Sequence, residues 1–187
     1  MKYFIGNWKM FGVPKSISII SKINFFLKKD KNRNKYRVVI TPPYTLIETF
    51  AKYFKNKLVS IGAQNCFHKD LFSSNTGAIS PYMLKQIGSK YIIIGHSDNR
   101  SEGDSDQILK DKFRFALMNN MKVIFCIGEN KKQKKNKQTF SVLKKQLLGV
   151  LEKKFNKNNI IIAYEPIWSI GTGMIPGPND LIKNTFF

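Results

Sequence analysis

The stretch Y-I-I-I-G-H-S, residues 91–97, decides the fold. An uninterrupted apolar run ends here in a glycine, a histidine and a serine. Apolar runs without polar alternation are typical of strands buried on both faces, as in parallel sheets. Similar runs recur along the chain, at residues 3–5, 37–40, 58–61, 123–127 and 160–164. The sequence therefore predicts six buried strands.

Segments with helical spacing of apolar residues separate these runs. Three such stripes are Ile17, Ile20, Ile23, Phe26 and Leu27; Ile108, Leu109, Lys112, Phe113 and Ala116; and Leu143, Leu147, Val150 and Leu151. Ser80-Pro81 is typical of a helix cap followed by proline at the first helical position. Alternating strands and helices predict a parallel sheet, as a barrel or as an open doubly wound sheet. We expect one domain over residues 1–187.

The charge balance is strongly basic, with Lys+Arg 32 against Asp+Glu 12 and a net charge of +20. Arginine, which suits bidentate phosphate and base contacts, supplies only four of these residues. We therefore expect a solvated lysine-rich surface with weak polyanion binding and no specific nucleic-acid partner. No G-x-G-x-x-G motif follows the first strand, so a dinucleotide-binding unit is unsupported.

The two cysteines, Cys66 and Cys126, do not form a C-x-x-C pair. The N-terminal residues lack the apolar segment of a signal peptide, and no run of 18 apolar residues occurs. These features predict a cytoplasmic protein without a membrane span.

Polar or glycine-containing segments follow most of the expected strands. They are G-N-W-K at 6–9, G-A-Q-N at 62–65, G-H-S at 95–97, C-I-G-E at 126–129 and Glu165-Pro166. In a parallel barrel the carboxyl ends of the strands share one face, so Lys9, His96 and Glu165 are expected to converge. This set is suited to proton abstraction next to a carbonyl, with a glutamate base, a histidine electrophile and a lysine that stabilises the oxyanion. Each residue alone also has an ordinary structural explanation.

In combination, these motifs resemble the triosephosphate isomerase family. The resemblance rests on G-N-W-K-M at 6–10, G-H-S-D-N-R at 95–100, C-I-G-E at 126–129 and A-Y-E-P-I-W-S-I-G-T-G at 163–173, with T-G-A-I-S at 76–80 similar to the family's dimer loop. It extends from Tyr3 to about Gly173 and continues more weakly to Lys183. It implies a TIM (βα)8-type barrel, an α/β fold. Because six strands are predicted, we expect about six βα units, with strands 7 and 8 missing.

The family interconverts dihydroxyacetone phosphate and D-glyceraldehyde 3-phosphate through an enediolate, in glycolysis and gluconeogenesis, without a metal or cofactor. Carried over by motif, the catalytic residues are Glu165, His96 and Lys9. The substrate-binding residues are Asn7, Trp8, Lys9 and Gly171. Supporting residues are Asp98, Ser97, Cys126 and Glu129. The lid extends from Pro166 to Pro176 and includes Ile167, Trp168, Gly171, Thr172 and Gly173.

Several positions depart from the family pattern. Asp98 and Asn99 stand where the family usually has G-H-S-E-R-R, and Ala78 replaces a glutamate in the dimer loop. Met174-Ile175-Pro176 replaces a hinge usually reading K-[TS]-A. The resemblance still implies a homodimer, with interface residues Gln64, Ser73 and Thr76.

Two alternative functions follow from the same sequence. The chain could be a degenerate, non-catalytic remnant with non-specific polyanion binding, since the loops after the last two strands usually build the phosphate site. It could also be a different βα-barrel lyase or isomerase, which the eleven-residue lid motif disfavours.

Overall fold

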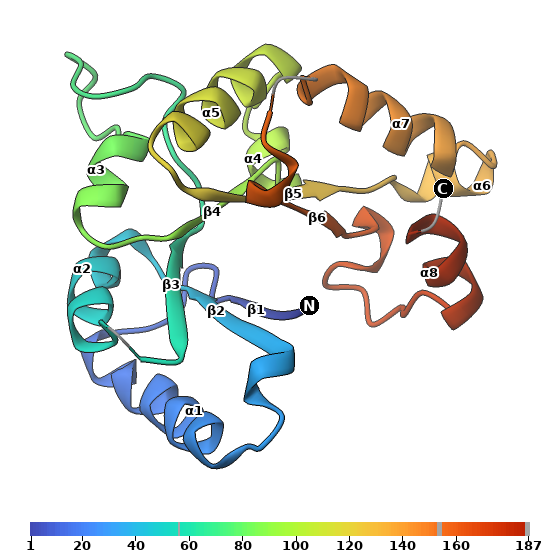
Figure 1. Ribbon diagram of the computed structural model, residues 1–187. Helices are drawn as coiled ribbons and strands as arrows, with labels where there is room; N and C mark the ends of the chain where they lie inside the picture. Colours follow the sequence, from blue (N-terminus) through green and yellow to red (C-terminus); the bar gives the residue numbers. More distant parts are fainter. Residues whose placement is uncertain (56, 153–154, 186–187) are drawn as a thin grey trace.

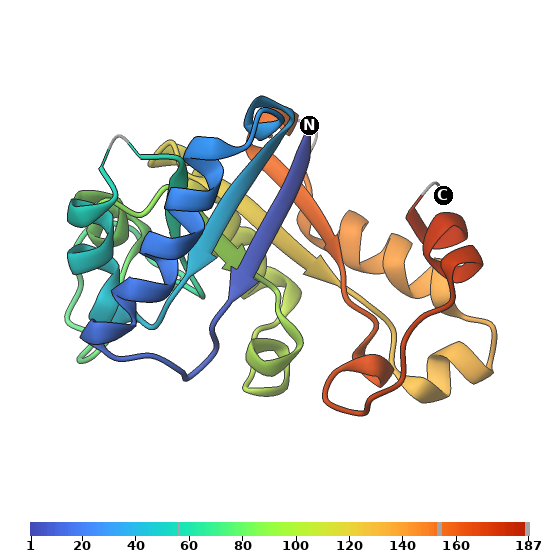
Figure 2. The ribbon, with the colours of Figure 1, turned by 90° about the horizontal axis from the view of Figure 1, so that it is seen from below.

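The computed structural model describes residues 1–55, 57–152 and 155–185. Within these ranges the chain forms one curved sheet of six strands with helices on its outer side (Figures 1 and 2). The strands are β1 Lys2–Asn7, β2 Tyr36–Thr41, β3 Val59–Ala63, β4 Tyr91–Ile94, β5 Lys122–Ile127 and β6 Ile160–Tyr164. All six strands predicted from the apolar runs are confirmed.

The strands are parallel and follow one another in chain order, β1-β2-β3-β4-β5-β6. A doubly wound sheet would reverse its strand order at a switch point, whereas a barrel adds each strand beside the previous one. The sheet is therefore a half-barrel, and the described residues supply six of the eight strands of a closed barrel. β1 and β6 form its two edges.

The longer helices are α1 Ile17–Lys29, α2 Tyr44–Tyr53, α5 Asp106–Met118, α7 Thr139–Val150 and α8 Pro178–Thr185. The shorter ones are α3 Pro81–Gln86, α4 Ser97–Ser101 and α6 Lys131–Lys135, with 3-10 turns η1 Pro14–Ser16, η2 Arg33–Lys35, η3 Lys157–Asn159 and η4 Ile167–Ser169. The cap predicted at Ser80 is present, since its hydroxyl accepts a hydrogen bond from the Met83 N–H at 3.2 Å.

Two apolar layers hold the sheet. The larger layer lies between the sheet and the outer helices and includes Ile40, Ile92 and Phe125. The smaller layer lies on the concave face, where Val39, Tyr91, Ile93, Ile124 and Cys126 are buried. Successive strand residues point to opposite faces, so each uninterrupted apolar run serves both layers.

Buried polar residues are paired inside this framework. The Lys112 ammonium lies 2.7 Å from the Asp104 carboxylate and donates to Asn65 Oδ1 at 2.9 Å. Asn65 Oδ1 also accepts from the Cys66 N–H at 2.8 Å. Lys112, which the helical stripe placed on the buried face, is therefore buried as a paired cation that connects α5 to the loop after β3.

Candidate active site

The turn after β4 fixes the position of His96. Gly95 has φ +76°, and a Cβ there would lie 2.8 Å from the Phe125 ring, so the tight turn requires glycine. His96 is buried and is the N-cap of α4, where its Nδ1 accepts the Asp98 N–H at 3.1 Å. Because Nδ1 is an acceptor, the imidazole is neutral and carries its proton on Nε2.

Glu165 follows β6 and faces that proton. Its backbone N–H donates to the Ile127 carbonyl at 2.8 Å, which joins the ends of β5 and β6. Its Oε2 lies 3.6 Å from His96 Nε2. Oε2 is buried and has no hydrogen-bond partner among the described residues. A buried carboxylate oxygen left unpaired costs stability, and such an atom is often functional.

Lys9 reaches the same face from the end of β1. Its backbone has φ +51°, held by the Asn7 side chain, which accepts the Lys9 N–H at 2.9 Å, and by Gln64, which donates to the Lys9 carbonyl at 2.8 Å. The Lys9 ammonium lies 3.3 Å from Asp98 Oδ2, and that oxygen lies 3.4 Å from His96 Nδ1. The shorter aspartate therefore still reaches Lys9.

Cys126 lies next to the glutamate from the end of β5. Burial, and then the charge of Glu165 and its hydrogen bond, raises the pKa of the Cys126 thiol, so the thiol stays protonated. Ser97, Cys126 and Glu165 line a small void of about 10 Å³. This space is about large enough for one water molecule.

Arg100 is a site residue that the sequence analysis did not single out. Its Nε donates to the Gly95 carbonyl at 2.7 Å and its Nη2 to the Cys126 carbonyl at 3.3 Å. It thereby holds the ends of β4 and β5 together beside the site. Its place in the G-H-S-D-N-R motif is the sequence feature that could have identified it as a site residue.

Glu129 anchors the lid. Its fully buried carboxylate accepts hydrogen bonds from the Tyr164 hydroxyl, at 3.1 and 3.2 Å, and from Trp168 Nε1, at 2.9 Å. Its carbonyl accepts the Ile167 N–H at 3.0 Å. Glu129, two residues after the end of β5, therefore fixes the segment that leads from β6 into the lid at both of its ends.

The remainder of the lid is more exposed. Gly171, Thr172 and Gly173 are exposed, and the Thr172 hydroxyl donates to the Trp168 carbonyl at 3.0 Å. Pro166 is the N-cap of the 3-10 turn η4, which begins at Ile167. The lid is therefore attached firmly at its start and loosely near its glycines.

The structure places Trp8 away from the site. Its indole packs edge-to-face on Phe50, with ring centroids 5.8 Å apart, and against the backbone of Gly12. Trp8 thus packs against the outer core, and its role in substrate binding stays a prediction. The short motif G-N-W-K did not reveal this packing, because the contact between Trp8 and Phe50 joins residues far apart in the chain.

The expected interface residues differ in their surroundings. Gln64 turns toward the site, where its amide donates to the carbonyls of Lys9 and Thr41. Ser73 and Thr76 lie in the exposed loop between β3 and α3, which projects from the half-barrel (Figure 1).

The described residues contain no group of three or more histidine, cysteine, aspartate or glutamate side chains that could hold a metal ion. None of the described helices has the length and apolar character needed to cross a membrane.

A half-barrel with a glutamate, a neutral histidine and a lysine at the carboxyl ends of three strands defines an enzyme of the βα-barrel class. A family model described as triosephosphate isomerase matches residues 2–184. The triosephosphate isomerase of Alkaliphilus oremlandii is 38% identical over 172 residues, covering 90% of this chain and 67% of that relative. The Saccharomyces cerevisiae triosephosphate isomerase is 37% identical over 181 residues, covering 95% of this chain and 71% of that relative.

A solved structure agrees. The crystal structure of triosephosphate isomerase from Bartonella henselae superimposes with a TM-score of 0.83 at 33% identity, covering 89% of this chain and 68% of that one. The chain therefore belongs to the triosephosphate isomerase family, a family of isomerases that act on phosphorylated trioses. It spans about two thirds to three quarters of the length of these relatives.

Proposed function

We propose that the chain carries the proton-transfer centre for interconverting dihydroxyacetone phosphate and D-glyceraldehyde 3-phosphate. The observation that supports this most directly is the unpaired Glu165 Oε2, 3.6 Å from the Nε2–H of a neutral His96. Oε2 is free to take a proton from a substrate C–H bond, and the Nε2–H is able to donate to the neighbouring carbonyl oxygen. The pair therefore supplies a base and an electrophile at one place, and substrate binding has to widen the 3.6 Å gap between them.

In the proposed reaction, Glu165 removes the proton from the carbon next to the substrate carbonyl. The electron pair moves into an enediolate, whose oxygen accepts the His96 Nε2–H and interacts with the Lys9 ammonium. The hydroxyl proton of the enediolate passes from the oxygen of the first carbon to the oxygen of the second by way of His96 Nε2. Glu165 then returns the carbon proton to the neighbouring carbon, which completes the isomerisation without a redox step. Gly171 and the lid close over the substrate phosphate and exclude water.

The proposal also includes a homodimeric assembly and a cytoplasmic location. The exposed loop with Ser73 and Thr76 supports a homodimer, since Phe72 and Leu71 in this loop are large apolar residues left exposed. A triosephosphate isomerase of central carbon metabolism is expected in the cytoplasm.

The test is solvent proton exchange. Dihydroxyacetone phosphate is incubated with the chain in D2O, and deuterium incorporation at the carbon next to the carbonyl is followed by NMR. This readout detects proton abstraction even when complete turnover is slow. We expect Glu165→Gln to lower the exchange rate at least about 100-fold, because a carboxamide is no base.

The control is Glu48→Gln, which removes an exposed carboxylate of α2 that is paired with Lys52. It should exchange at the rate of the unchanged chain. Equal exchange by the unchanged chain and by Glu165→Gln would contradict the proposed function and favour a non-catalytic remnant. Polyanion binding stronger than that of other proteins of similar charge would then support that alternative.

A further inference from the structure

The helix α8 follows the lid directly in the chain and reaches back to the residues that hold the lid's beginning (Figure 1). Asp180 and Asn184 lie four residues apart, on one face of this helix. Asp180 pairs at 3.0 Å with Lys134, whose ammonium lies over the Trp168 ring. The Asn184 amide donates from Nδ2 to the Tyr164 hydroxyl at 2.9 Å. One face of α8 therefore contacts two of the groups around Trp168.

The Asn184 contact begins a chain of hydrogen bonds that ends at the lid. The Tyr164 hydroxyl lies 3.2 and 3.1 Å from the two carboxylate oxygens of Glu129. The same carboxylate accepts the Trp168 Nε1–H at 2.9 Å. The amide of Asn184, the hydroxyl of Tyr164 and the carboxylate of Glu129 thus connect α8 to the indole in the first turn of the lid.

The direction of each hydrogen bond in this chain is fixed by chemistry. A carboxylate only accepts, so the single proton of the Tyr164 hydroxyl points to Glu129. Burial, and then the charge of Glu129, raises the pKa of Tyr164, so the hydroxyl keeps this proton at neutral pH. The hydroxyl can then only accept from Asn184, which orients the amide with Nδ2 toward it. Donation by Asn184 therefore turns the hydroxyl toward Glu129 and polarises it.

Glu129 depends on a correctly turned hydroxyl. Its side chain is fully buried, and among the described residues Tyr164 and Trp168 are the donors that reach its carboxylate. A buried carboxylate that loses one of its donors is strongly destabilised. A hydroxyl that rotated away would therefore also disturb the carboxylate that holds the indole.

We propose that Asn184 is a positioning residue for the lid. By donating to Tyr164, it directs the hydroxyl to Glu129, and Glu129 holds Trp168 at the start of the lid. Asn184 acts through these side chains and not on the reacting atoms. Its effect on catalysis rests on the proposed function, whereas its effect on Trp168 does not.

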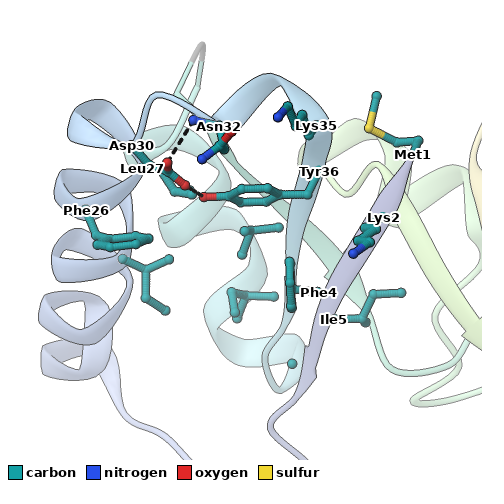
Figure 3. A pocket seen from close by; sticks show the side chains of 14 residues that line it. Met1, Lys2, Phe4, Ile5, Phe26, Leu27, Asp30, Asn32, Lys35 and Tyr36 are labelled. Atoms are coloured by element: carbon teal, nitrogen blue, oxygen red, sulfur yellow. Dashed lines mark hydrogen bonds between the residues drawn. The ribbon is translucent and has the colours of Figure 1, made fainter.

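A second tyrosine–carboxylate pair provides a matched comparison. The Tyr36 hydroxyl donates to the Asp30 carboxylate, which also accepts the Asn32 N–H at 2.8 Å (Figure 3). This pair lines an open groove beside β1, between the sheet and α1, with a volume of about 1070 Å³. Tyr36 is the first residue of β2, so it lies at the end of the sheet opposite the lid. Removing its hydroxyl should leave Trp168 unchanged.

The first experiment follows the indole N–H groups of the complete 187-residue chain by NMR. The chain has two tryptophans, and Trp8, which packs against the outer core, reports any general loss of structure. Asn184→Asp keeps the shape of the side chain but replaces the donor by an acceptor at neutral pH. It should raise the solvent exchange rate of the Trp168 indole at least about fivefold at pH 7, and leave that of Trp8 unchanged.

The pH dependence separates a lost donor from altered packing. A protonated carboxyl group donates as the amide does, and the ordinary pKa of aspartate is about 3.9. The ratio of the Trp168 exchange rates in Asn184→Asp and the unchanged chain should therefore fall toward one between about pH 7 and about pH 4. Asn179→Asp makes the same change at an exposed position of α8 and should give a ratio near one throughout. A raised ratio that does not change with pH would overturn the proposal.

A double-mutant cycle tests whether Asn184 acts through Tyr164. Tyr164→Phe removes the hydroxyl, so adding Asn184→Asp to it should change the Trp168 exchange rate no further. Additive effects of the two substitutions would show that Asn184 acts by another route. Tyr36→Phe is the control for the loss of a hydroxyl paired with a carboxylate.

The second experiment measures deuterium incorporation into dihydroxyacetone phosphate at a series of substrate concentrations. Asn184→Asp should raise KM by about threefold to tenfold and leave kcat within about twofold, because a less ordered lid loses more conformational freedom when it closes. An unchanged KM in an active chain would overturn the proposal.

The two experiments distinguish this proposal from the proposed function. Faster Trp168 exchange in Asn184→Asp, without Glu165-dependent deuterium incorporation in the unchanged chain, supports the hydrogen-bond chain and contradicts the proposed function. Glu165-dependent incorporation, with equal Trp168 exchange in Asn184→Asp and the unchanged chain, supports the proposed function and overturns the role of Asn184.

Discussion

Gly128 shows how a single residue without a side chain sets the position of the candidate base. The loops after β5 and β6 come so close here that a Cβ on Gly128 would lie 1.9 Å from the Glu165 carbonyl oxygen. The Gln146 amide accepts the Gly128 N–H at 2.9 Å and donates to its carbonyl at 3.0 Å. The backbone of Glu165 is therefore positioned by direct contact with a glycine fixed from α7.

Gly128→Ala should displace Glu165 from His96. Because the clash is with backbone, it cannot be relieved by a rotamer change, and a displacement of about 1 Å at a reacting group costs about 100-fold in rate. Overpacking should also lower the free energy of unfolding by about 1–3 kcal/mol. Deuterium exchange and chemical denaturation measure the two effects.

Gly177→Ala is the matched control, since a Cβ there meets no atom within 4 Å. It should leave both exchange and stability close to those of the unchanged chain. Equal behaviour of the two variants would show that the contact between the loops does not position Glu165.

At the scale of elements, α6 and α8 support the lid from outside the barrel. α6 begins at a capping box, in which Asn130 and Gln133 bond each other's backbone N–H at 2.9 Å. Lys134 of α6 lies over the Trp168 ring, 3.6 Å from its centroid, and pairs with Asp180 of α8 at 3.0 Å. Trp168 is thus held by Glu129 through its N–H and by Lys134 across its face.

Lys134→Met should loosen the lid without unfolding the chain. It removes a cation–π contact worth about 0.5–1 kcal/mol and a partly exposed ion pair worth about 0.2–1 kcal/mol. Together these losses should raise the rate of amide hydrogen exchange in the lid by about threefold to thirtyfold. Hydrogen exchange with mass spectrometry measures this rate in peptides covering 165–176. Lys135→Met, at an exposed position on the same helix, is the control and should leave lid exchange unchanged.

At the scale of the whole molecule, the net charge of +20 acts on a sheet with two open edges. Like charges destabilise the compact state through self-repulsion, and salt screens them over about 8 Å at physiological ionic strength. The same field attracts any polyanion, independent of sequence.

The thermal midpoint should therefore rise when NaCl is increased from about 10 mM to about 150 mM, and DNA binding should weaken over the same range. Scanning calorimetry and a filter-binding assay measure the two effects. Lys131→Glu combined with Lys135→Glu, both exposed on α6, should reduce both dependences. A salt-independent thermal midpoint would show that charge repulsion does not lower the free energy of unfolding significantly.

Local sequence patterns predicted most of the helices and strands. The differences between the predicted and observed bounds have local causes. The strand expected at 58–61 is found at Val59–Ala63, because Gly62 lies against Thr41 and Tyr91 in the packed sheet despite its low strand propensity. The lysine-rich run at 131–137 begins with the helix α6. The motifs named the candidate site residues that the structure brings together, apart from Arg100.

The sequence by itself determined the strands and the residue types at their carboxyl ends, because apolar periodicity and short motifs are properties of neighbouring residues. Only the tertiary structure decided that Glu165 and His96 face each other at 3.6 Å, that Glu129 holds Trp168, and that the groove beside β1 is open. These features depend on how far the sheet curves and where it stops. Such contacts join residues far apart in the chain, and packing of the whole sheet fixes them.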